Sequence, residues 1–368
     1  MRFALNAPTR FAGWPRWAAI LVLLLLSTVV LTSLPYERSS TNAARSVAGT
    51  SSNEGADLAL YQRIVAKMRD GQGYYEAAAP ELRERGFPVR PFVVFRMPTL
   101  AALLAWLPPG APRALLFALV AAVLTVWGLR LKSVFERLPP AIIAILLISA
   151  GCAASLQQSL LPFHEVWAAL LIALSIGLWR EESCLPSVLA GLAAVMFRET
   201  ALPYLLAMAG FALLDRRWRE LLAWSAAIAL FGVALAAHAV EVAAVTTAAD
   251  PVSPGWAGLG GWPIFLSMTR LTTPLTLVPL AATALVVPLT LLGWMAWRTP
   301  VALRVLSILA GYALMFMLFA RPDNFYWGLM IAPLLLLGLA FAPAALADLI
   351  QAARGKAPDL DRRAPAGP

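Results

Sequence analysis

Two carboxylic acids, Glu54 and Asp57, stand near the start of the polar, helix-like segment EGADLALYQRIVAKMRDGQGYY, which follows the first long apolar run. At 100° per residue, Asp57 falls within an apolar stripe that it shares with Tyr61 and Ile64. Partial burial raises the pKa of a carboxylic acid and makes it a better general base. Asp57 could equally be an N-cap or first-turn acid, and Glu54 could cap in its place or be a second acid of one site.

Three arginines are candidates for phosphate binding, because a guanidinium fork matches the geometry of phosphate oxygens. Arg90 and Arg96 lie in ERGFPVRPFVVFRMP, which its prolines keep extended, and Arg198 belongs to the turn FRET. The alternative for Arg96 is an anchor that faces lipid headgroups. For Arg198 the alternative is an ion pair with Glu199 that closes a short hairpin.

Further ionisable and aromatic residues gather at the predicted outer turns and are candidates for contact with a substrate. Charges at membrane depth suggest function by default, and aromatic rings could stack on sugars or form an interfacial belt. These candidates are Tyr61, Tyr74, Tyr75, His164, Glu165, Glu199, Arg321 and Asp323. In a second outer loop, Trp256 and Trp262 could roof a lipid or sugar site, while His238 is expected to be a polar core contact.

Several function classes are disfavoured by what the chain lacks. It has no Gly-rich phosphate loop and no basic motif with interleaved aromatic residues, so we expect no nucleic-acid partner. Its two cysteines lie far apart and it has only two histidines, so we expect neither a disulfide framework nor a metal site. Without an Asp-x-Asp motif, metal-independent chemistry is favoured, and no cofactor is implied.

The elements that must position these residues are apolar helices. The chain is 60% hydrophobic and only 13% charged, which indicates a polytopic, all-α membrane protein rather than a soluble one. The net charge of +9 then fits Lys and Arg retained in cytoplasmic loops. The apolar runs lie near residues 17–34, 112–130, 139–157, 163–180, 185–197, 200–214, 220–240, 273–297, 301–319 and 325–345.

The connections rich in Lys and Arg all fall on the cytoplasmic side, as the positive-inside rule requires, only if there are about ten passes and both termini are cytoplasmic. The first run is longer than a signal-peptide core, so we interpret it as an uncleaved helix. TLAALLAWL, residues 99–107, would span about 14 Å as a helix and is too short to cross, so it is expected to lie at the interface. A single membrane-embedded domain, 1–350, then carries a large outer loop, 35–110, and 351–368 reads as a disordered cytoplasmic tail.

Two other regions allow specific expectations. The runs 185–197 and 200–214 are best read as two short passes meeting at the outer turn FRET, because one long helix would carry a charge pair at mid-depth. The outer loop 241–272 reads as irregular structure near the headgroups.

The order of these features resembles the polytopic C-type glycosyltransferases (GT-C), which use polyprenyl-phosphate-linked sugars on the outer face of the membrane. The architecture is similar from residue 1 to about 345, and motifs are similar only near 54–107 and 191–206. The resemblance implies an inverting transferase in a bacterial plasma membrane, with its site facing the periplasm. Its acceptor would be an envelope glycan, a lipid or a protein.

By the same resemblance, Asp57 matches the catalytic base and Arg198 the cation near the donor phosphate. Family members often carry two adjacent acids, whereas Glu54 and Asp57 are three positions apart, which leaves open which of them is the base. We also expect no C-terminal soluble domain of the kind found in larger relatives.

Three rival functions fit the sequence less well than this one. A transporter or flippase for a lipid or lipid-linked sugar should show internal repeats and deep polar residues, neither of which is evident. A polysaccharide ligase or polymerase usually has its large outer loop late in the chain. A non-enzymatic partner of an envelope complex is the third. A glycosyltransferase should have a cavity open to both lipid and the outer aqueous face, with Asp57 on its wall.

Overall fold

The computed structural model describes residues 5–34, 59–135, 138–256 and 258–355, and the regular elements within them are helices, with two isolated bridges. The first half consists of α1 (Arg16–Ser33), a helix at 59–69, α3 (Tyr74–Glu84), η2 (Phe92–Val94), α4 (Thr99–Trp106), α5 (Ala111–Leu131), α6 (Leu138–Gly151), η3 (Ala153–Leu156), η4 (Gln158–Leu160) and α7 (His164–Leu178). The second half consists of α8 (Leu185–Phe197), η5 (Glu199–Ala201), α9 (Leu202–Leu214), α10 (Trp218–Val245), α11 (Gly261–Thr272), η6 (Pro274–Leu277), α12 (Leu280–Ala296), α13 (Pro300–Phe319), η7 (Pro322–Met330), α14 (Ala332–Leu335), η8 (Leu336–Ala340) and α15 (Ala342–Ala353).

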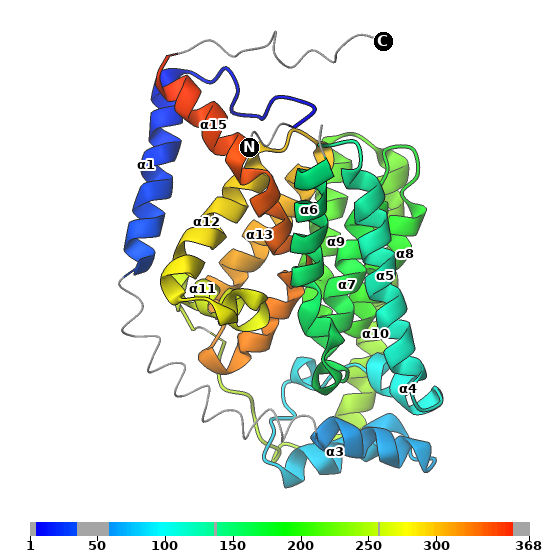
Figure 1. Cartoon of the computed structure of the whole chain (residues 1–368). Coiled ribbons are helices and arrows are strands. Elements are labelled where there is room, and N and C mark those ends of the chain that lie inside the picture. Colours follow the sequence, from blue (N-terminus) through cyan, green and yellow to red (C-terminus); the bar gives the residue numbers. More distant parts are fainter. Residues whose placement is uncertain (1–4, 35–58, 136–137, 257, 356–368) are drawn as a thin grey trace.

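The long helices run side by side as a bundle (Figure 1). Helix α1 begins and α15 ends at the same end of the bundle, where the two helices pack against each other. At the opposite end, the helix at 59–69, α3 and α4 lie across or beside the ends of the long helices. These short helices therefore form a cap over one end of the bundle, which we call the capped end.

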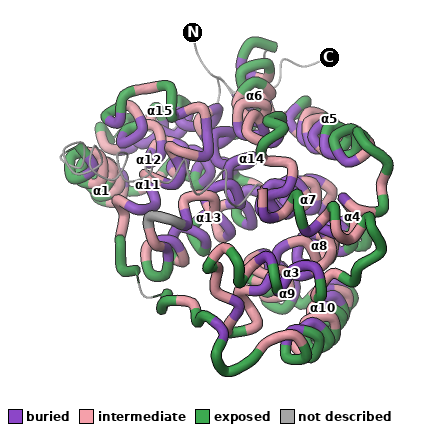
Figure 2. The backbone as a smooth tube through the Cα atoms, turned by 90° about the horizontal axis from the view of Figure 1, so that it is seen from below, coloured by how far each residue is buried: buried purple, intermediate pink, exposed green. Residues whose placement is uncertain are grey.

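Four helices are long and apolar enough to cross a membrane, namely α1, α5, α10 and α13, and the bent pair Ala332–Ala340 with Ala342–Ala353 would make a fifth. The other apolar helices within the described residues are shorter than such a span requires by the same measure. The expected apolar runs are therefore present as helices, but ten spans are not confirmed. Seen from below, buried residues gather in the middle of the bundle and exposed ones around its rim (Figure 2).

The break expected at FRET, with a short helix on each side, is confirmed. Helix α8 ends at Phe197, Arg198 is extended at φ −147° and ψ 117°, and a short 3₁₀ turn leads into α9. Pro203 lies in the first turn of α9, where its missing N–H costs no helical hydrogen bond. The break keeps the charged turn at an end of both helices and out of the middle of one.

The apolar stripe of the segment after residue 58 is also confirmed, where the structure describes it. Leu60 and Ile64 are buried against α3, Phe95 and Val242 of α10. Gly71, at φ 96°, takes the left-handed conformation expected just after a helix end. The stripe therefore packs on protein, and this packing fixes the cap to α10.

Two sequence interpretations are wrong in part. The apolar run 325–345 is not one helix but the series η7, α14, η8 and α15, with a 47° bend between the last two arms. Prolines occupy the first turns of η7, α14 and α15, and each interrupts the preceding helical hydrogen bonds. The loop 241–272 was expected to be irregular, but α10 runs to Val245 and Gly261–Thr272 forms α11.

Helix α15 extends to Ala353, inside the predicted tail, and residues 356–368 lie outside the described part of the chain.

Candidate functional site

A cavity of about 790 Å³ lies at the capped end of the bundle. Its walls come from the helix at 59–69, α3, the segment 85–96, the starts of α7 and α9, residues 253–256, the end of α13 and η7. The cap and the bundle therefore share one pocket, and its wall combines charged, aromatic and aliphatic side chains. This combination is typical of ligand sites, where a few polar groups orient a ligand held mainly by apolar contacts.

Most of the candidate residues predicted from the sequence line this cavity. They are Tyr61, Tyr74, Arg96, His164, Glu165, Arg198, Glu199 and Arg321. They come from separate segments that only the folded chain brings together. The turns at 164–165 and 198–199 meet here because α7 and α8 pack along each other.

Other candidates lie elsewhere. The Tyr75 hydroxyl is 2.9 Å from Nδ1 of buried His238, whose Nε2 is 2.9 Å from the Phe95 carbonyl oxygen. His238 is thus the polar core contact that was expected. Arg90 is not part of the lining, and its guanidinium donates to the Ala248 carbonyl at 2.6 Å. Glu54 and Asp57 lie outside the described residues, as does the side chain of Asp323.

Arg198 is enclosed by carboxylates. Its Nε lies 2.6 Å from Oε1 of Glu165 and its NH1 lies 3.1 Å from Oε2 of Glu199. The Arg198 and Glu165 side chains are each 3% exposed. The ion pair expected between Arg198 and Glu199 is therefore present, and Arg198 also pairs with Glu165 of α7. The positive charge of Arg198 is matched by two negative ones.

The turn around Arg198 is also tied to the rest of the pocket. Glu199 Oε1 accepts a hydrogen bond from the Met97 N–H at 3.2 Å, so the same carboxylate joins Arg198 to the segment that carries Arg96. The Tyr312 hydroxyl of α13 donates to the Thr200 carbonyl at 2.8 Å. These bonds hold the turn in place relative to both the cap and the bundle.

Arg96 differs from Arg198 in its surroundings. Among the described residues, no ion pair or hydrogen bond engages its guanidinium, and its carbonyl accepts from the Tyr74 hydroxyl at 2.7 Å. Burial alone would lower the pKa of Arg96, but nearby Tyr61, Tyr326, Glu165 and Glu199 outweigh it and raise the pKa. Arg96 is therefore a permanent cation on the wall of the cavity, with its donors available to a ligand.

Several lining residues were missed by the sequence reasoning. Arg85, Asn324, Tyr326 and Trp327 all reach the cavity, and the last three lie in η7. Tyr326 and Trp327 were missed because the sequence from residue 325 on resembles the start of an apolar span. Trp256, considered as a roof, does line the cavity, whereas Trp262 donates to the Ser33 hydroxyl of α1 at 2.8 Å.

No cluster of three or more His, Cys, Asp or Glu side chains suited to a metal occurs within the described part of the chain. Among the residues that the structure describes, the polar groups at the cavity are arginines, two carboxylates and a histidine, together with hydroxyl and amide groups. Such a set can bind an anion and hydrogen-bond to hydroxyl groups without a metal ion.

The long apolar helices are compatible with an integral membrane protein. Comparisons with protein-family models, with curated proteins and with solved structures found no match. The cavity and its residues must therefore carry any assignment of function.

Proposed function

We propose that this protein is an inverting membrane glycosyltransferase that moves a sugar from a polyprenyl-phosphate donor to a glycan, lipid or protein acceptor. The acceptor oxygen would attack the anomeric carbon from the face opposite the phosphate. Its proton would pass to a carboxylate, and the bond between the anomeric carbon and the phosphate oxygen would break. The electron pair of that bond would leave with polyprenyl phosphate.

The observation that supports this best is the guanidinium of Arg96 on the cavity wall, which has no ion-pair or hydrogen-bond partner among the described residues. A phosphate oxygen is the natural partner for such a cation, and a charge-assisted hydrogen bond is worth about 1.5–3 kcal/mol. Arg198 remains a predicted phosphate contact, since it lines the same cavity, but its charge is already matched by Glu165 and Glu199. We therefore propose Arg96 as the main residue that binds the donor phosphate.

The proposed base is Asp57, with Glu54 as the alternative. On helical spacing in the sequence, Asp57 shares a stripe with Tyr61 and Ile64, and both of these line the cavity. The side chains of Tyr61 and Tyr74 in the cavity would contact the sugar or its phosphate.

The apolar part of the lining supports a lipid-linked donor. Leu202 and Pro203 of α9 and Met315 and Phe319 of α13 contribute to the wall where the cavity meets the bundle. Phe319 is 49% exposed, so this side of the site includes an apolar surface that can meet a polyprenyl chain. We propose a ten-pass topology in a bacterial plasma membrane, with the capped end on the periplasmic side.

The decisive experiment measures release of polyprenyl phosphate from a panel of polyprenyl-phosphate sugars, with acceptor extracts present. We expect wild type to turn over at least one donor, and Asp57→Asn to abolish turnover while the protein stays folded and binds the donor. Arg96→Gln should weaken donor binding about 10- to 100-fold. Arg63→Gln is a matched control, because Arg63 is exposed on the helix at 59–69 and absent from the cavity lining.

The outcomes separate the competing interpretations. If Asp57→Asn keeps near-normal turnover, Asp57 is not the base and Glu54 is tested next. If folded wild-type protein releases polyprenyl phosphate from no donor, the transferase proposal fails. Transport of a lipid-linked sugar, measured in reconstituted vesicles, would then be the function to examine.

A further inference from the structure

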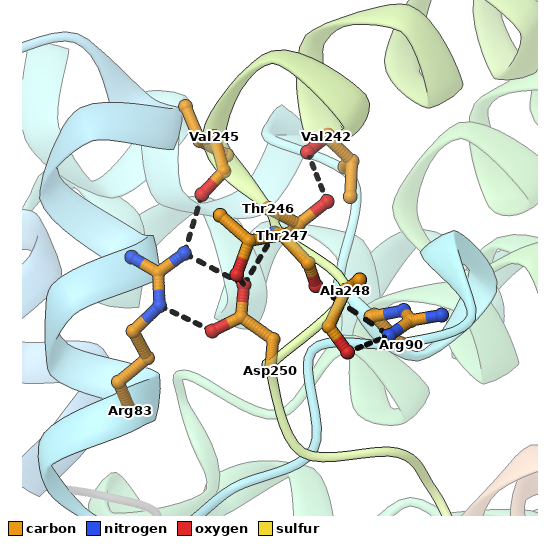
Figure 3. A network of polar contacts seen from close by, with 8 residues as sticks. All are labelled: Arg83, Arg90, Val242, Val245, Thr246, Thr247, Ala248 and Asp250. Atoms are coloured by element: carbon orange, nitrogen blue, oxygen red, sulfur yellow. Dashed lines mark hydrogen bonds and ion pairs between the residues drawn. The ribbon is translucent and has the colours of Figure 1, made fainter.

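The segment 246–256, which follows α10, is fastened to α3 by a forked ion pair (Figure 3). Arg83 Nε and NH2 donate to the two carboxylate oxygens of Asp250 at 2.6 and 2.9 Å. The same carboxylate accepts from the Thr247 N–H at 2.7 Å, which fixes the turn at the start of the segment. A bidentate pair of this kind fixes orientation as well as distance.

Further bonds fasten the segment along its length. Arg90 donates to the Ala248 carbonyl at 2.6 Å, as Figure 3 shows, and the Ser253 N–H donates to the Arg90 carbonyl at 2.7 Å. On the far side, Arg321 NH1 lies 3.2 Å from the Pro254 carbonyl oxygen. We call residues 246–256 the strap, because they join the cap to η7 beside the cavity.

The strap brings one large aromatic ring to the cavity. Trp256 lines the cavity and is 39% exposed, although it belongs to a segment held mainly by polar contacts. A ring that is held at a pocket and left partly uncovered still has apolar area that a ligand can bury. The fastened backbone before it makes this a preorganised surface, which lowers the entropy cost of binding.

The chemistry around Trp256 suits a sugar ring better than an acyl chain. A pyranose has an apolar face of C–H groups that packs on an aromatic ring, and a rim of hydroxyl groups that needs hydrogen-bond partners. Ser253, Asn324 and Tyr326 line the same cavity and supply hydroxyl and amide groups. Ser253 and Asn324 each have a hydrogen-bond partner of their own, but no hydrogen bond engages the Tyr326 hydroxyl among the described residues. An acyl chain that covered this hydroxyl would leave it unpartnered, which is unfavourable.

We propose that Trp256 is the platform for a carbohydrate acceptor at the rim of the cavity, and that Arg83 and Asp250 are positioning residues that hold the strap beneath it. The inference deepens the proposed function and rests on it for the meaning of the acceptor. It narrows that acceptor from a glycan, lipid or protein to a glycan. The binding itself can be measured without any donor.

The test is retention of purified full-length protein, in nanodiscs, on immobilised hexose, pentose and N-acetylhexosamine oligosaccharides. Wild type should bind at least one of them. Trp256→Ala should weaken that affinity about tenfold, and Trp256→Phe by much less, because a ring remains. Trp106→Ala is the matched control, since Trp106 is 83% exposed on α4 and does not line the cavity.

The positioning role has its own readout. Asp250→Asn should weaken oligosaccharide binding but leave binding of polyprenyl phosphate in vesicles unchanged, whereas general misfolding would reduce both. The inference is overturned if wild type retains no oligosaccharide, or if Trp106→Ala and Trp256→Ala weaken binding equally. Trp256-dependent glycan binding with no polyprenyl phosphate release would overturn the proposed function alone, and release without glycan binding would overturn this inference alone.

Discussion

Replacing Arg198 by Met tests whether this residue is held chiefly to neutralise two carboxylates. The substitution keeps a long, flexible side chain but leaves Glu165, which is 3% exposed, without its partner at 2.6 Å. Glu199 loses a partner at 3.1 Å, but its side chain is 16% exposed and can still be hydrated from the cavity. The loss of stability should therefore come mainly from the buried, uncompensated carboxylate of Glu165.

The size of the effect follows from the burial of this pair. Removing one partner of a buried ion pair costs about 3–5 kcal/mol, because the remaining charge is uncompensated. Protonating a glutamate at pH 7 costs about 4 kcal/mol, which limits the loss from above. We therefore expect Arg198→Met to lose about 3–4 kcal/mol of the free energy of unfolding. That is a large fraction of the 5–15 kcal/mol usual for a folded protein.

The assay is equilibrium unfolding of purified protein in detergent at pH 7, followed by tryptophan fluorescence. The double variant Arg198→Met with Glu165→Gln should recover most of the lost free energy of unfolding, because Gln carries no charge that needs the arginine as a partner. Arg219→Met is the control, since Arg219 is exposed near the start of α10, and it should stay within about 0.5 kcal/mol of wild type. The reasoning is refuted if Arg198→Met matches wild type, or if the double variant is no more stable than Arg198→Met.

Two further predictions concern packing and pH. Gly293→Ala should destabilise by about 1–3 kcal/mol, because the new methyl group would overlap the Gly338 carbonyl oxygen and force α12 from η8. Gly311→Ala on α13, where nothing lies within 4 Å, should gain about 0.4–1 kcal/mol, so equal shifts in unfolding midpoint would contradict this packing. The Arg83 guanidinium, with the Thr247 N–H, holds the pKa of Asp250 well below its usual range, so the strap attachment is complete above about pH 4 and lost only as pH falls further. Limited proteolysis between pH 7 and 3 measures this, and strap cleavage that rises already near pH 6 would disprove it.

The sequence predicts those parts of the fold that depend on local pattern. The break at Arg198 was predictable because a charged pair between two short apolar runs is costly at mid-depth. The buried stripe with Leu60 and Ile64 was predictable because it repeats at the helical period. The C-terminal region was not, since hydropathy alone does not distinguish one long helix from short helices broken at proline. The close contact of the η8 backbone with α12 at Gly338 leaves no room for a side chain there, and this contact is known only from the packing of α12.

The roles of the arginines at the site depend on neighbours that the sequence does not reveal. Arg198 and Arg96 look equally suited to phosphate in the sequence, and the family resemblance favours Arg198. In the fold, Arg198 meets Glu165 because α7 packs along α8, while the guanidinium of Arg96 meets no such partner among the described residues. A phosphate that approached Arg198 would compete with two carboxylates already in place, whereas at Arg96 it would supply the missing countercharge. The binding energy for an anion should therefore be greatest on the cap side of the cavity, near the helix at 59–69, which follows Asp57 in the sequence.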